Sequence, residues 1–284
     1  MTPHFKITGE YTVSKFASGE LQVTLVSLHT HDDDDDILIK GSILSSDNLM
    51  ELLLLVEAIR HHNPTTPIVL NMPYCAYSRQ DRRCSSKEAL SSKVFAQLIN
   101  SCNFYKVYTF DNHSYVSTAL IDRCFDVPAT DILTIAISSR KLPISNYSYL
   151  VAPDAGALKK VQACCEATNT KLLRADKLRS LTNGAISDTI IHLPPDASLK
   201  NTKVLIIDDI CQGGRTFVEL AKAIKAIEPT CEVHLYVSHG FFDRGLDDMI
   251  AAGISHFYTT DSVCTLQHQQ LTYSLYYPKI KHFH

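Results

Sequence analysis

The sequence predicts an α/β protein made of two similar domains, each a mainly parallel sheet flanked by helices. Short apolar runs alternate with amphipathic segments of helical length along most of the chain. This alternation is typical of parallel sheets that are covered by helices on both faces. The same plan occurs once in each half, and 284 residues are sufficient for two α/β domains of ordinary size.

The first half opens with a predicted helix over 48–60, where Asn48 and Glu51 stand at capping-box spacing. This helix is expected to end before the Asn63-Pro64 pair. The other elements predicted for this half are a strand over 67–72, a helix over 86–101, and strands over 105–110 and 132–137.

The second half repeats the alternation. Its predicted elements are strands over 149–152, 204–207 and 231–238 and helices over 155–167, 214–227 and 246–252. The seam between the halves falls near 138–148, so we expect domains over 1–140 and 141–284. We expect the final ~20 residues to return to the first domain.

Composition narrows the class of protein. Lys plus Arg total 27 against 30 for Asp plus Glu, which argues against a nucleic-acid-binding protein. The nine cysteines form no CxxC pair and suggest reduced cytosolic thiols rather than a disulfide framework. The N-terminus lacks the pattern of a signal peptide, and Glu51 and Glu57 interrupt the most apolar window. We therefore expect a cytoplasmic protein that is not bound to a membrane.

The most informative stretch is Val204–Thr216, in which an apolar strand ends in Asp208 and Asp209 and a glycine turn opens a helix. Ligands of open α/β sheets lie at the carboxyl ends of the strands. Gly213 and Gly214 permit close backbone approach, and the helix N-terminus favours a phosphate group. The two carboxylates are suited to accept hydrogen bonds from vicinal ribose hydroxyls.

This stretch resembles the phosphoribosyl-binding signature of type I phosphoribosyltransferases and ribose-phosphate pyrophosphokinases. The resemblance implies phosphoribosyltransferase-type domains, in which Asp208 and Asp209 hold the ribose hydroxyls and Gln212, Gly213, Gly214, Arg215 and Thr216 hold the 5-phosphate. Gln212 stands where the family usually has an acid, and Arg215 stands where it has a small residue. Both differences make the loop more favourable to anions.

A second segment separates the two families. Residues 73–82 read PYCAYSRQDR and match the P-Y-x2-Y-x-R-Q-D-R stretch of the pyrophosphokinases, which phosphoribosyltransferases lack. Arg79 is suited to phosphates or adenine, and Gln80 to hydrogen bonds with a base or ribose. The resemblance implies that Arg79, Gln80 and Asp81 belong to an ATP site.

Two strand ends resemble the family's Mg²⁺–ATP site. These are the Phe110–His113 segment and the Asp154–Gly156 turn. The resemblance implies that His113 contributes to the ATP site, and that His113 and Asp154 contribute to the metal site. Asp154 is chemically the more natural Mg²⁺ ligand, because Mg²⁺ prefers oxygen donors, whereas a lone histidine at a strand end commonly serves packing.

Two further segments extend the resemblance over about residues 12–265. Asp176–Arg179 is similar to the base of the family's catalytic loop, which implies that Lys177 and Arg179 contact the phosphates during transfer. Phe16–Glu20 is similar to F-x-x-G-E, which in the family reaches into a neighbouring subunit's ATP site. The resemblance thus places Phe16 and Glu20 at that site and implies a homo-oligomer, although Ser18 replaces the usual Asp or Asn.

One region departs from the family. Where the family has Val-Arg-Gly before the strand that starts near Ile37, this chain has five aspartates at 32–36. Such a run is usually a solvated loop and would repel phosphate. We therefore do not expect the family's phosphate activation here.

Taken with the resemblance, the sequence implies a Mg²⁺-dependent diphosphokinase that moves the β,γ-diphosphate of ATP to the C1 hydroxyl of ribose 5-phosphate. Three alternatives remain. The acceptor is a ribose 5-phosphate embedded in ADP-ribose, as in NAD salvage; the chain is a phosphoribosyltransferase, which the 73–82 segment disfavours; or it is a non-catalytic regulatory subunit. A regulatory subunit would be expected to lose Lys177, Arg179 or the acidic pair, and this chain keeps them.

Overall fold

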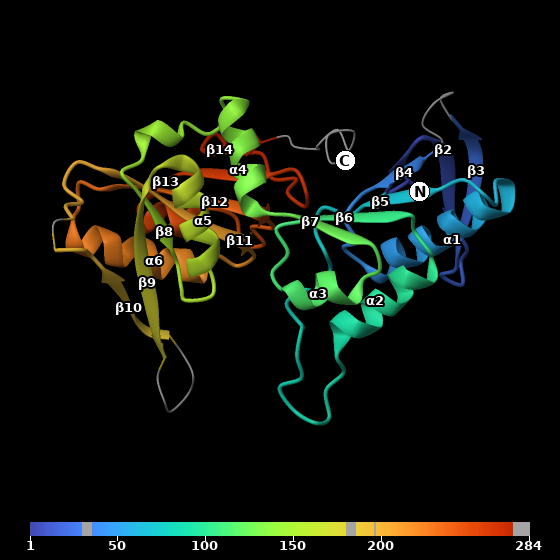
Figure 1. The fold of residues 1–284 in the computed structure, drawn as a ribbon, viewed down its shortest axis with the longest axis horizontal. Coiled ribbons are helices and arrows are strands. Elements are labelled where there is room, and N and C mark those ends of the chain that lie inside the picture. Colours follow the sequence, from blue (N-terminus) through green and yellow to red (C-terminus); the bar gives the residue numbers. More distant parts are fainter. Residues whose placement is uncertain (30–35, 180–185, 196, 275–284) are drawn as a thin grey trace. The chain divides into compact units, whose positions relative to one another are not determined.

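The computed structural model describes residues 1–29, 36–179, 186–195 and 197–274, without the side chains of 177–179, 186–188 and 273–274. Each half of the chain has an α/β fold with a mainly parallel sheet, as the sequence predicts (Figure 1). The chain divides into two compact units, Met1–Val127 and Pro128–His284.

The first unit contains a five-stranded sheet in the order β1-β4-β5-β6-β7. Strands β4 to β7 are parallel, and β1 pairs with β4 in the antiparallel sense at one edge. The strands are β1 (Lys6–Ile7), β4 (Ile37–Lys40), β5 (Ile68–Asn71), β6 (Lys106–Phe110) and β7 (Cys124–Val127). The helices α1 (Ser46–His62), α2 (Ser91–Ser101) and α3 (Tyr115–Leu120) lie below this sheet as drawn in Figure 1.

A separate antiparallel hairpin, β2 (Gly9–Lys15) and β3 (Leu21–Leu28), packs against α1. Tyr11 and Val13 of β2 are buried in the core of this unit. The Tyr11 hydroxyl donates to the buried Glu51 carboxylate of α1 at 2.7 Å and accepts from the Phe5 amide at 2.8 Å. Because Glu51 also accepts from the His4 amide at 2.8 Å, one carboxylate joins three segments.

The second unit contains a seven-stranded sheet in the order β10-β9-β8-β11-β12-β13-β14. All neighbouring strands are parallel except β9 and β10. The strands are β8 (Tyr149–Ala152), β9 (Lys171–Arg179), β10 (Ile186–His192), β11 (Lys203–Cys211), β12 (Glu232–Gly240), β13 (Ile254–Thr260) and β14 (Leu271–Ser274). The helices are α4 (Ala129–Ser138), α5 (Leu158–Thr168), α6 (Arg215–Ile227) and α7 (Asp247–Ala251), with a 3-10 turn, η1 (Ile144–Asn146).

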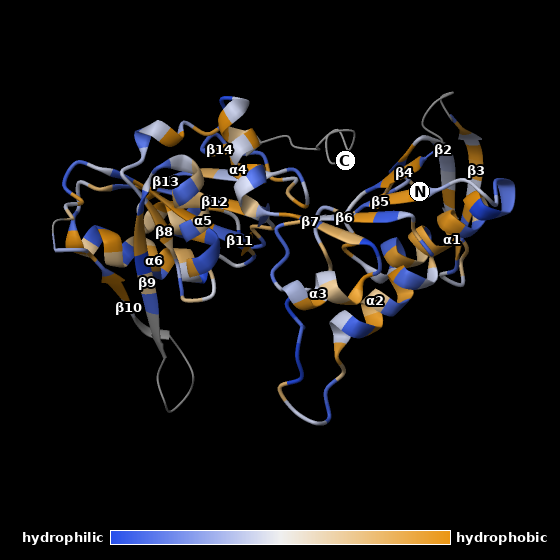
Figure 2. Cartoon of the chain, viewed as in Figure 1, coloured by the Kyte–Doolittle hydropathy of each residue, from blue (hydrophilic) through white to orange (hydrophobic). Residues whose placement is uncertain are grey.

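The central strand β11 is buried on both of its faces. Val204 and Ile206 pack in the cluster that contains Phe217 of α6, whereas Leu205 and Ile207 pack in the cluster that contains the α4 and α5 side chains. This division follows from the two-residue period of a strand. Figure 2 shows the resulting contrast between hydrophobic central strands and helices of mixed hydropathy.

The segment predicted as a strand over 132–137 is part of helix α4. Its apolar run is short, and such a run does not distinguish a buried strand from a buried helix. Ala129, Leu133 and Ala136 face one side at helical spacing and pack in a cluster with Val161 of α5. Since α4 belongs to the core of the second unit, the boundary lies at Val127/Pro128 rather than at 140/141.

Other element boundaries also differ from the prediction. Helix α1 is capped by Ser45, whose hydroxyl accepts from the Asn48 amide at 3.1 Å, so Asn48 lies inside the helix. Helix α2 begins at Ser91 rather than at 86. Strand β14 extends the sheet of the second unit, so residues 271–274 do not return to the first domain as predicted, and 275–284 lie outside the described residues.

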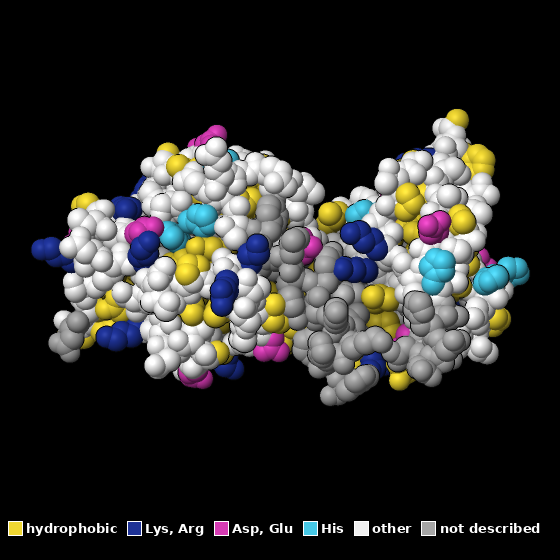
Figure 3. Space-filling model, turned by 90° about the horizontal axis from the view of Figure 1, so that it is seen from above, with side chains coloured by type: hydrophobic (Ala, Val, Ile, Leu, Met, Phe, Trp, Pro, Cys, Tyr) yellow, Lys and Arg dark blue, Asp and Glu magenta, His cyan; other side chains and the backbone are white. Residues whose placement is uncertain are grey.

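The distribution of surface charge and the state of the cysteines can be compared with the expectations from composition. On the face drawn in Figure 3, Lys and Arg side chains stand singly or in small groups among other residue types. None of the nine cysteines, all of them in described segments, forms a disulfide, and only Cys84 is exposed. In the described part of the chain, no helix has both the length and the apolar character needed to cross a bilayer.

Candidate functional site

The acidic pair lies at the carboxyl end of β11, in the middle of the second sheet. Asp208 is half-buried and Asp209 is buried, and the Asp209 amide donates to the Asp208 carboxylate at 3.0 Å. Burial, followed by the charge of Asp209, raises the pKa of Asp208 well above its usual range, and Lys160 opposes this. Two poorly hydrated carboxylates at a strand end are strong acceptors for hydroxyl donors of a ligand.

The glycine turn after β11 has two positions with different requirements. Gly214 precedes α6 with φ of 73°, and an added Cβ atom would lie 2.9 Å from the Met249 sulfur of α7. Gly213 has more room, because its nearest neighbour would be Arg244 Nε at 3.7 Å. The left-handed conformation at 214 therefore requires glycine, whereas the absence of a side chain at 213 leaves the backbone open to a ligand.

The start of α6 presents backbone amides beside this turn. The amides of Phe217 and Val218 both donate to the Gly214 carbonyl at 3.0 Å. The first amides of a helix have no acceptor within the helix, and the helix dipole favours an anion there. Exposed Arg215 and half-buried Thr216 stand in the first turn, so Gln212–Thr216 has the chemistry expected of a phosphate-binding loop, and its role stays a prediction.

The chain segment after β12 supports this loop from behind. The amides of Phe241 and Phe242 donate to the Cys211 carbonyl at 2.8 and 3.2 Å, and the Asp243 amide donates to the Gln212 carbonyl at 3.1 Å. These bonds bring the exposed Arg244 beside Gly213. Arg244 was not predicted as a site residue, because its position beside Gly213 depends on the pairing of β11 with β12.

Strands β12 and β13 pair with each other, and side-chain hydrogen bonds join their carboxyl ends. His239 is buried with Nδ1 at 2.8 Å from the Ser262 hydroxyl, and Thr260 donates to the Ser238 carbonyl at 2.6 Å. These hydrogen bonds hold the carboxyl ends of β12 and β13 together at the edge of the sheet where the glycine turn lies.

In the first unit, the 73–82 segment follows β5 and is held by backbone hydrogen bonds. The Phe110 amide donates to the Pro73 carbonyl at 3.0 Å, and the Gln80 amide donates to the Tyr77 carbonyl at 2.9 Å. Arg79 and Gln80 are exposed, and Asp81 is half-buried. The segment therefore displays its cationic and amide side chains at the carboxyl edge of the first sheet.

The Phe110–His113 strand end lies beside this segment. Asp126 accepts from the Asn112 amide at 3.3 Å and from the Thr109 hydroxyl at 3.0 Å, which fixes the chain just before His113. His113 is exposed and belongs to the first unit.

Asp154 belongs to the second unit, where it follows β8 and accepts from the Ala157 amide at 3.1 Å. Within the described ranges, no group of three or more His, Cys, Asp or Glu side chains is arranged to hold a metal. Asp154 is an oxygen donor of the type that Mg²⁺ accepts, which suits a metal that arrives with phosphate oxygens and water as its other ligands.

Lys177 and Arg179 lie on β9, opposite Thr189 and Ile186 of the antiparallel strand β10. Their side chains, and residues 180–185, lie outside the described residues. The backbone thus places both residues on β9, between the edge strand β10 and the inner strand β8, and their predicted contacts with phosphates stay a prediction.

Phe16–Glu20 is the tip of the β2–β3 hairpin. The Phe16 amide donates to the Glu20 carbonyl at 2.8 Å, and the Ser18 hydroxyl donates to the Glu20 carboxylate at 2.6 Å. The Phe16 side chain is 56% exposed. An exposed aromatic ring at the tip of a hairpin is available to contact another molecule, and the predicted contact with a neighbouring subunit stays a prediction.

The parallel sheet, the acidic pair on its central strand and the glycine loop define the second unit as a phosphoribosyltransferase-type domain. Residues 154–255 match the phosphoribosyl transferase domain, and residues 5–102 match the N-terminal domain of ribose phosphate pyrophosphokinase. The chain therefore belongs to the ribose-phosphate pyrophosphokinase family.

Individual relatives agree with this assignment. The chain is 28% identical over 270 residues to the ribose-phosphate pyrophosphokinase of Thermotoga maritima, covering 93% of this chain and 81% of the relative. It is 29% identical over 259 residues to that of Burkholderia pseudomallei, with 90% and 78% covered. Phosphoribosylpyrophosphate synthetase from Mycobacterium smegmatis shares the fold, with a TM-score of 0.75 at 19% identity over 93% of this chain and 85% of that chain.

Proposed function

We propose that this protein is a diphosphokinase that transfers the β,γ-diphosphate of ATP to the C1 hydroxyl of a ribose 5-phosphate, giving phosphoribosyl pyrophosphate and AMP. The observation that carries the proposal is the Asp208–Asp209 pair beside the glycine loop that opens α6. The pair accepts from the 2- and 3-hydroxyls of the ribose, and Gln212–Thr216 binds the 5-phosphate. A sugar held at both ends presents its C1 hydroxyl in a fixed position.

ATP is assigned to the first unit in this proposal. Exposed Arg79 and Gln80 bind phosphates and the nucleoside, with half-buried Asp81 and exposed His113 at the neighbouring strand ends. Phe16 and Glu20 at the hairpin tip serve the ATP site of a second copy of the chain. This last role implies a homo-oligomer of at least two subunits, and we place the protein in the cytoplasm as a separate part of the proposal.

The reaction forms a bond between the C1 oxygen and the β-phosphorus and breaks the bond between that phosphorus and the α,β-bridging oxygen. AMP leaves with the bridging oxygen, and the hydroxyl proton passes to solvent. Lys177 and Arg179 spread over the transferring phosphates and neutralise the charge that develops on them. Mg²⁺ would add neutralising charge, for which Asp154 of the second unit would offer an oxygen donor and His113 of the first unit a nitrogen donor. No covalent intermediate on the protein is required.

The decisive experiment incubates purified protein with ATP, Mg²⁺ and ribose 5-phosphate and follows AMP by chromatography and the sugar product by mass spectrometry. Equal amounts of AMP and diphosphorylated ribose 5-phosphate are expected. ADP as the product would contradict diphosphate transfer. No reaction with any ribose 5-phosphate acceptor, in protein that binds both substrates, would instead favour the regulatory-subunit alternative.

A second candidate acceptor is ribose 5-phosphate embedded in ADP-ribose. The observation that favours it is the pair of cationic side chains, Arg215 and Arg244, beside the phosphate loop. The same assay with ADP-ribose in place of ribose 5-phosphate separates the two acceptors, because the sugar products differ in mass.

A further inference from the structure

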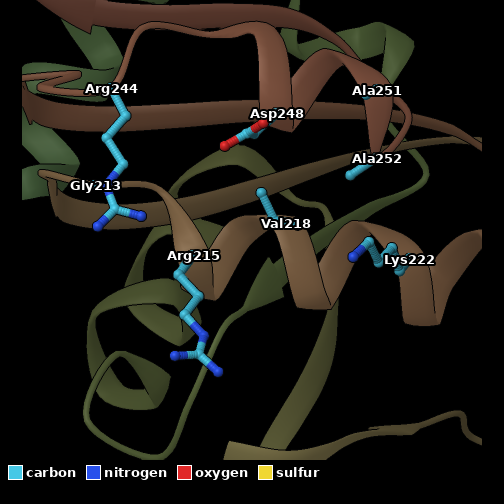
Figure 4. A pocket seen from close by; sticks show the side chains of 8 residues that line it. All are labelled: Gly213, Arg215, Val218, Lys222, Arg244, Asp248, Ala251 and Ala252. Atoms are coloured by element: carbon cyan, nitrogen blue, oxygen red, sulfur yellow. The ribbon is translucent and has the colours of Figure 1, made fainter.

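A groove of about 350 Å³ lies on the second unit between α6 and α7 (Figure 4). It begins at Gly213 of the phosphate loop and continues past Val218 and Lys222 of α6, opposite Asp248, Ala251 and Ala252. This volume falls in the range of small-molecule sites. We call this feature the α6–α7 groove.

The groove has an excess of positive charge. Arg215, Lys222 and Arg244 line it together with a single acid, Asp248. Lys222 has an exposed ion pair with Glu219 of its own helix at 3.6 Å, whereas in the described part of the chain no carboxylate forms an ion pair with Arg215 or Arg244. Three cations against one carboxylate favour an anionic ligand.

The groove is continuous with the phosphate loop. Figure 4 shows Arg244 reaching from the loop before α7 toward Gly213. A Cβ atom on Gly213 would lie only 3.7 Å from Arg244 Nε, and the Asp243 amide is bonded to the Gln212 carbonyl. A phosphate in the Gln212–Thr216 loop therefore has the mouth of the groove beside it, with the Arg244 guanidinium at that mouth.

The groove is also longer than one phosphate requires. Lys222 lies two turns, or about 10 Å, beyond Arg215 along α6. Val218, Ala251 and Ala252 provide small apolar surfaces in this space, and Asp248 provides an acceptor for hydroxyl or amino groups. The cations near the loop are suited to a second phosphate. The apolar wall and the acceptor beyond them are suited to a larger group attached to that phosphate.

We infer that the α6–α7 groove binds a group attached to the 5-phosphate of the acceptor. This inference rests on the proposed function and specifies its substrate class, a ribose 5-phosphate joined through a diphosphate to a further group. The C1 end of such an acceptor is held by the acidic pair as before, so the bonds formed and broken are unchanged. Arg244 and Lys222 then determine specificity without touching the reacting atoms.

The test compares kcat/KM for AMP release with ADP-ribose and with ribose 5-phosphate in the wild-type protein and in the double variant Arg244→Ala/Lys222→Ala. The wild type is expected to prefer ADP-ribose, and the double variant to reduce that preference about tenfold or more. Lys200→Ala, an exposed lysine on the loop before β11, is the matched control and leaves the preference unchanged. Equal use of both acceptors by the wild type, or an equal loss for both in the double variant, overturns the inference.

Two further measurements separate other causes. If the groove instead binds a free anion, the wild type shows no preference for ADP-ribose. Inorganic phosphate then alters the rate with ribose 5-phosphate in the wild type but not in the double variant. If no acceptor yields AMP, the proposed function fails, and calorimetric titration still tests the groove. Tighter binding of ADP-ribose than of ribose 5-phosphate, lost in the double variant, supports the groove, and equal binding rejects it.

Discussion

At the scale of single residues, Asp208 and Asp209 place two carboxylates side by side in a poorly hydrated strand end. The raised pKa of Asp208 shows that ionisation of this pair opposes folding. Because the pair destabilises the folded chain, we expect that its function is to bind a ligand. A substitution in the pair should therefore lower activity without lowering stability.

Asp209→Asn is expected to lower kcat/KM with the ribose acceptor by about 10- to 100-fold, because a charge-assisted hydrogen bond to a ligand hydroxyl is lost. The steady-state rate of AMP release measures this effect. Asp243→Asn, in the exposed loop after β12, serves as the control for a general effect of removing a carboxylate. An unchanged kcat/KM in Asp209→Asn would remove the acidic pair from the ribose site.

Asp208→Asn is expected to raise the melting temperature at neutral pH. The folded protein holds the Asp208 proton more tightly than the unfolded chain does. Ionisation of Asp208 therefore lowers the free energy of unfolding by its full amount above the folded pKa and not at all below the ordinary pKa of about 3.9. The gain in melting temperature must therefore shrink as the pH falls from 7 toward 4. Calorimetry at several pH values measures it, and a gain that does not depend on pH would contradict the assignment.

Gly214 allows a prediction about backbone conformation. Gly214→Ala is expected to lower the free energy of unfolding by about 2 kcal/mol or more, because alanine is strained in the left-handed conformation and its Cβ atom would collide with the buried Met249. Gly213→Ala is the matched control, with no contact closer than 3.7 Å, and costs less than about 1 kcal/mol. Urea unfolding compares them, and equal losses would show that residue 214 has no special requirement.

At the scale of elements, a polar network connects the amino ends of β12 and β13 with the turn before β8. His234 on β12 has Nδ1 at 2.6 Å from the Tyr147 hydroxyl and Nε2 at 2.7 Å from the Glu232 carboxylate. Lys203 of β11 pairs with Glu232 at 2.8 Å, and the ring of His256 on β13 lies 5.7 Å from that of His234. Burial lowers the pKa of both His234 and His256.

This network predicts a loss of stability in mild acid. The unfolded chain binds the histidine protons more tightly than the folded chain, so stability falls as the pH drops below the ordinary histidine pKa of about 6.5. His234→Gln is expected to flatten part of this dependence between about pH 5 and 7 in thermal unfolding. Exposed His61→Gln is the control, and an unchanged slope in His234→Gln would exclude the network as its source.

A strand could be predicted from the sequence where its residues form a continuous buried run, and it was missed where exposed residues interrupt that run. The strand Tyr149–Ala152 was predicted with its observed bounds, because all four of its residues are buried. The β2–β3 hairpin was missed, since its strands alternate exposed residues with buried or half-buried ones and therefore contain no continuous apolar run. The 132–137 run was misassigned because a short apolar run does not distinguish a buried strand from the buried face of a helix such as α4.

At the scale of the whole molecule, the two units are predicted to bind different substrates. Arg79→Ala is expected to weaken binding of ATP by about tenfold and to leave ribose 5-phosphate binding unchanged, and Asp209→Asn is expected to do the reverse. Calorimetric titration with each substrate alone measures both effects. If either variant weakens both substrates equally, the division of labour between the units is wrong.

In the second unit, the residues of the candidate site could be picked out from the sequence, whereas the residues that surround the site could not. The acidic pair and the glycine turn are contiguous in sequence, so their chemistry is visible without a structure. Arg244 is brought to Gly213 only by the pairing of β11 with β12 and by the turn that follows, and no local pattern marks it. The α6–α7 groove could not be predicted for the same reason.

The distribution of the thiols gives the protein a natural attachment point for a spectroscopic probe. Burial raises the pKa of Cys102, Cys124 and Cys165 to about 11 and that of Cys211 to about 12, which keeps these thiols protonated and slow to react with alkylating dyes. Cys84 alone is exposed, two positions after Arg82 at the end of the 73–82 segment. A maleimide fluorophore is therefore expected to attach first at Cys84 in the unmodified chain, where its emission is expected to change if the proposed ATP segment binds a nucleotide.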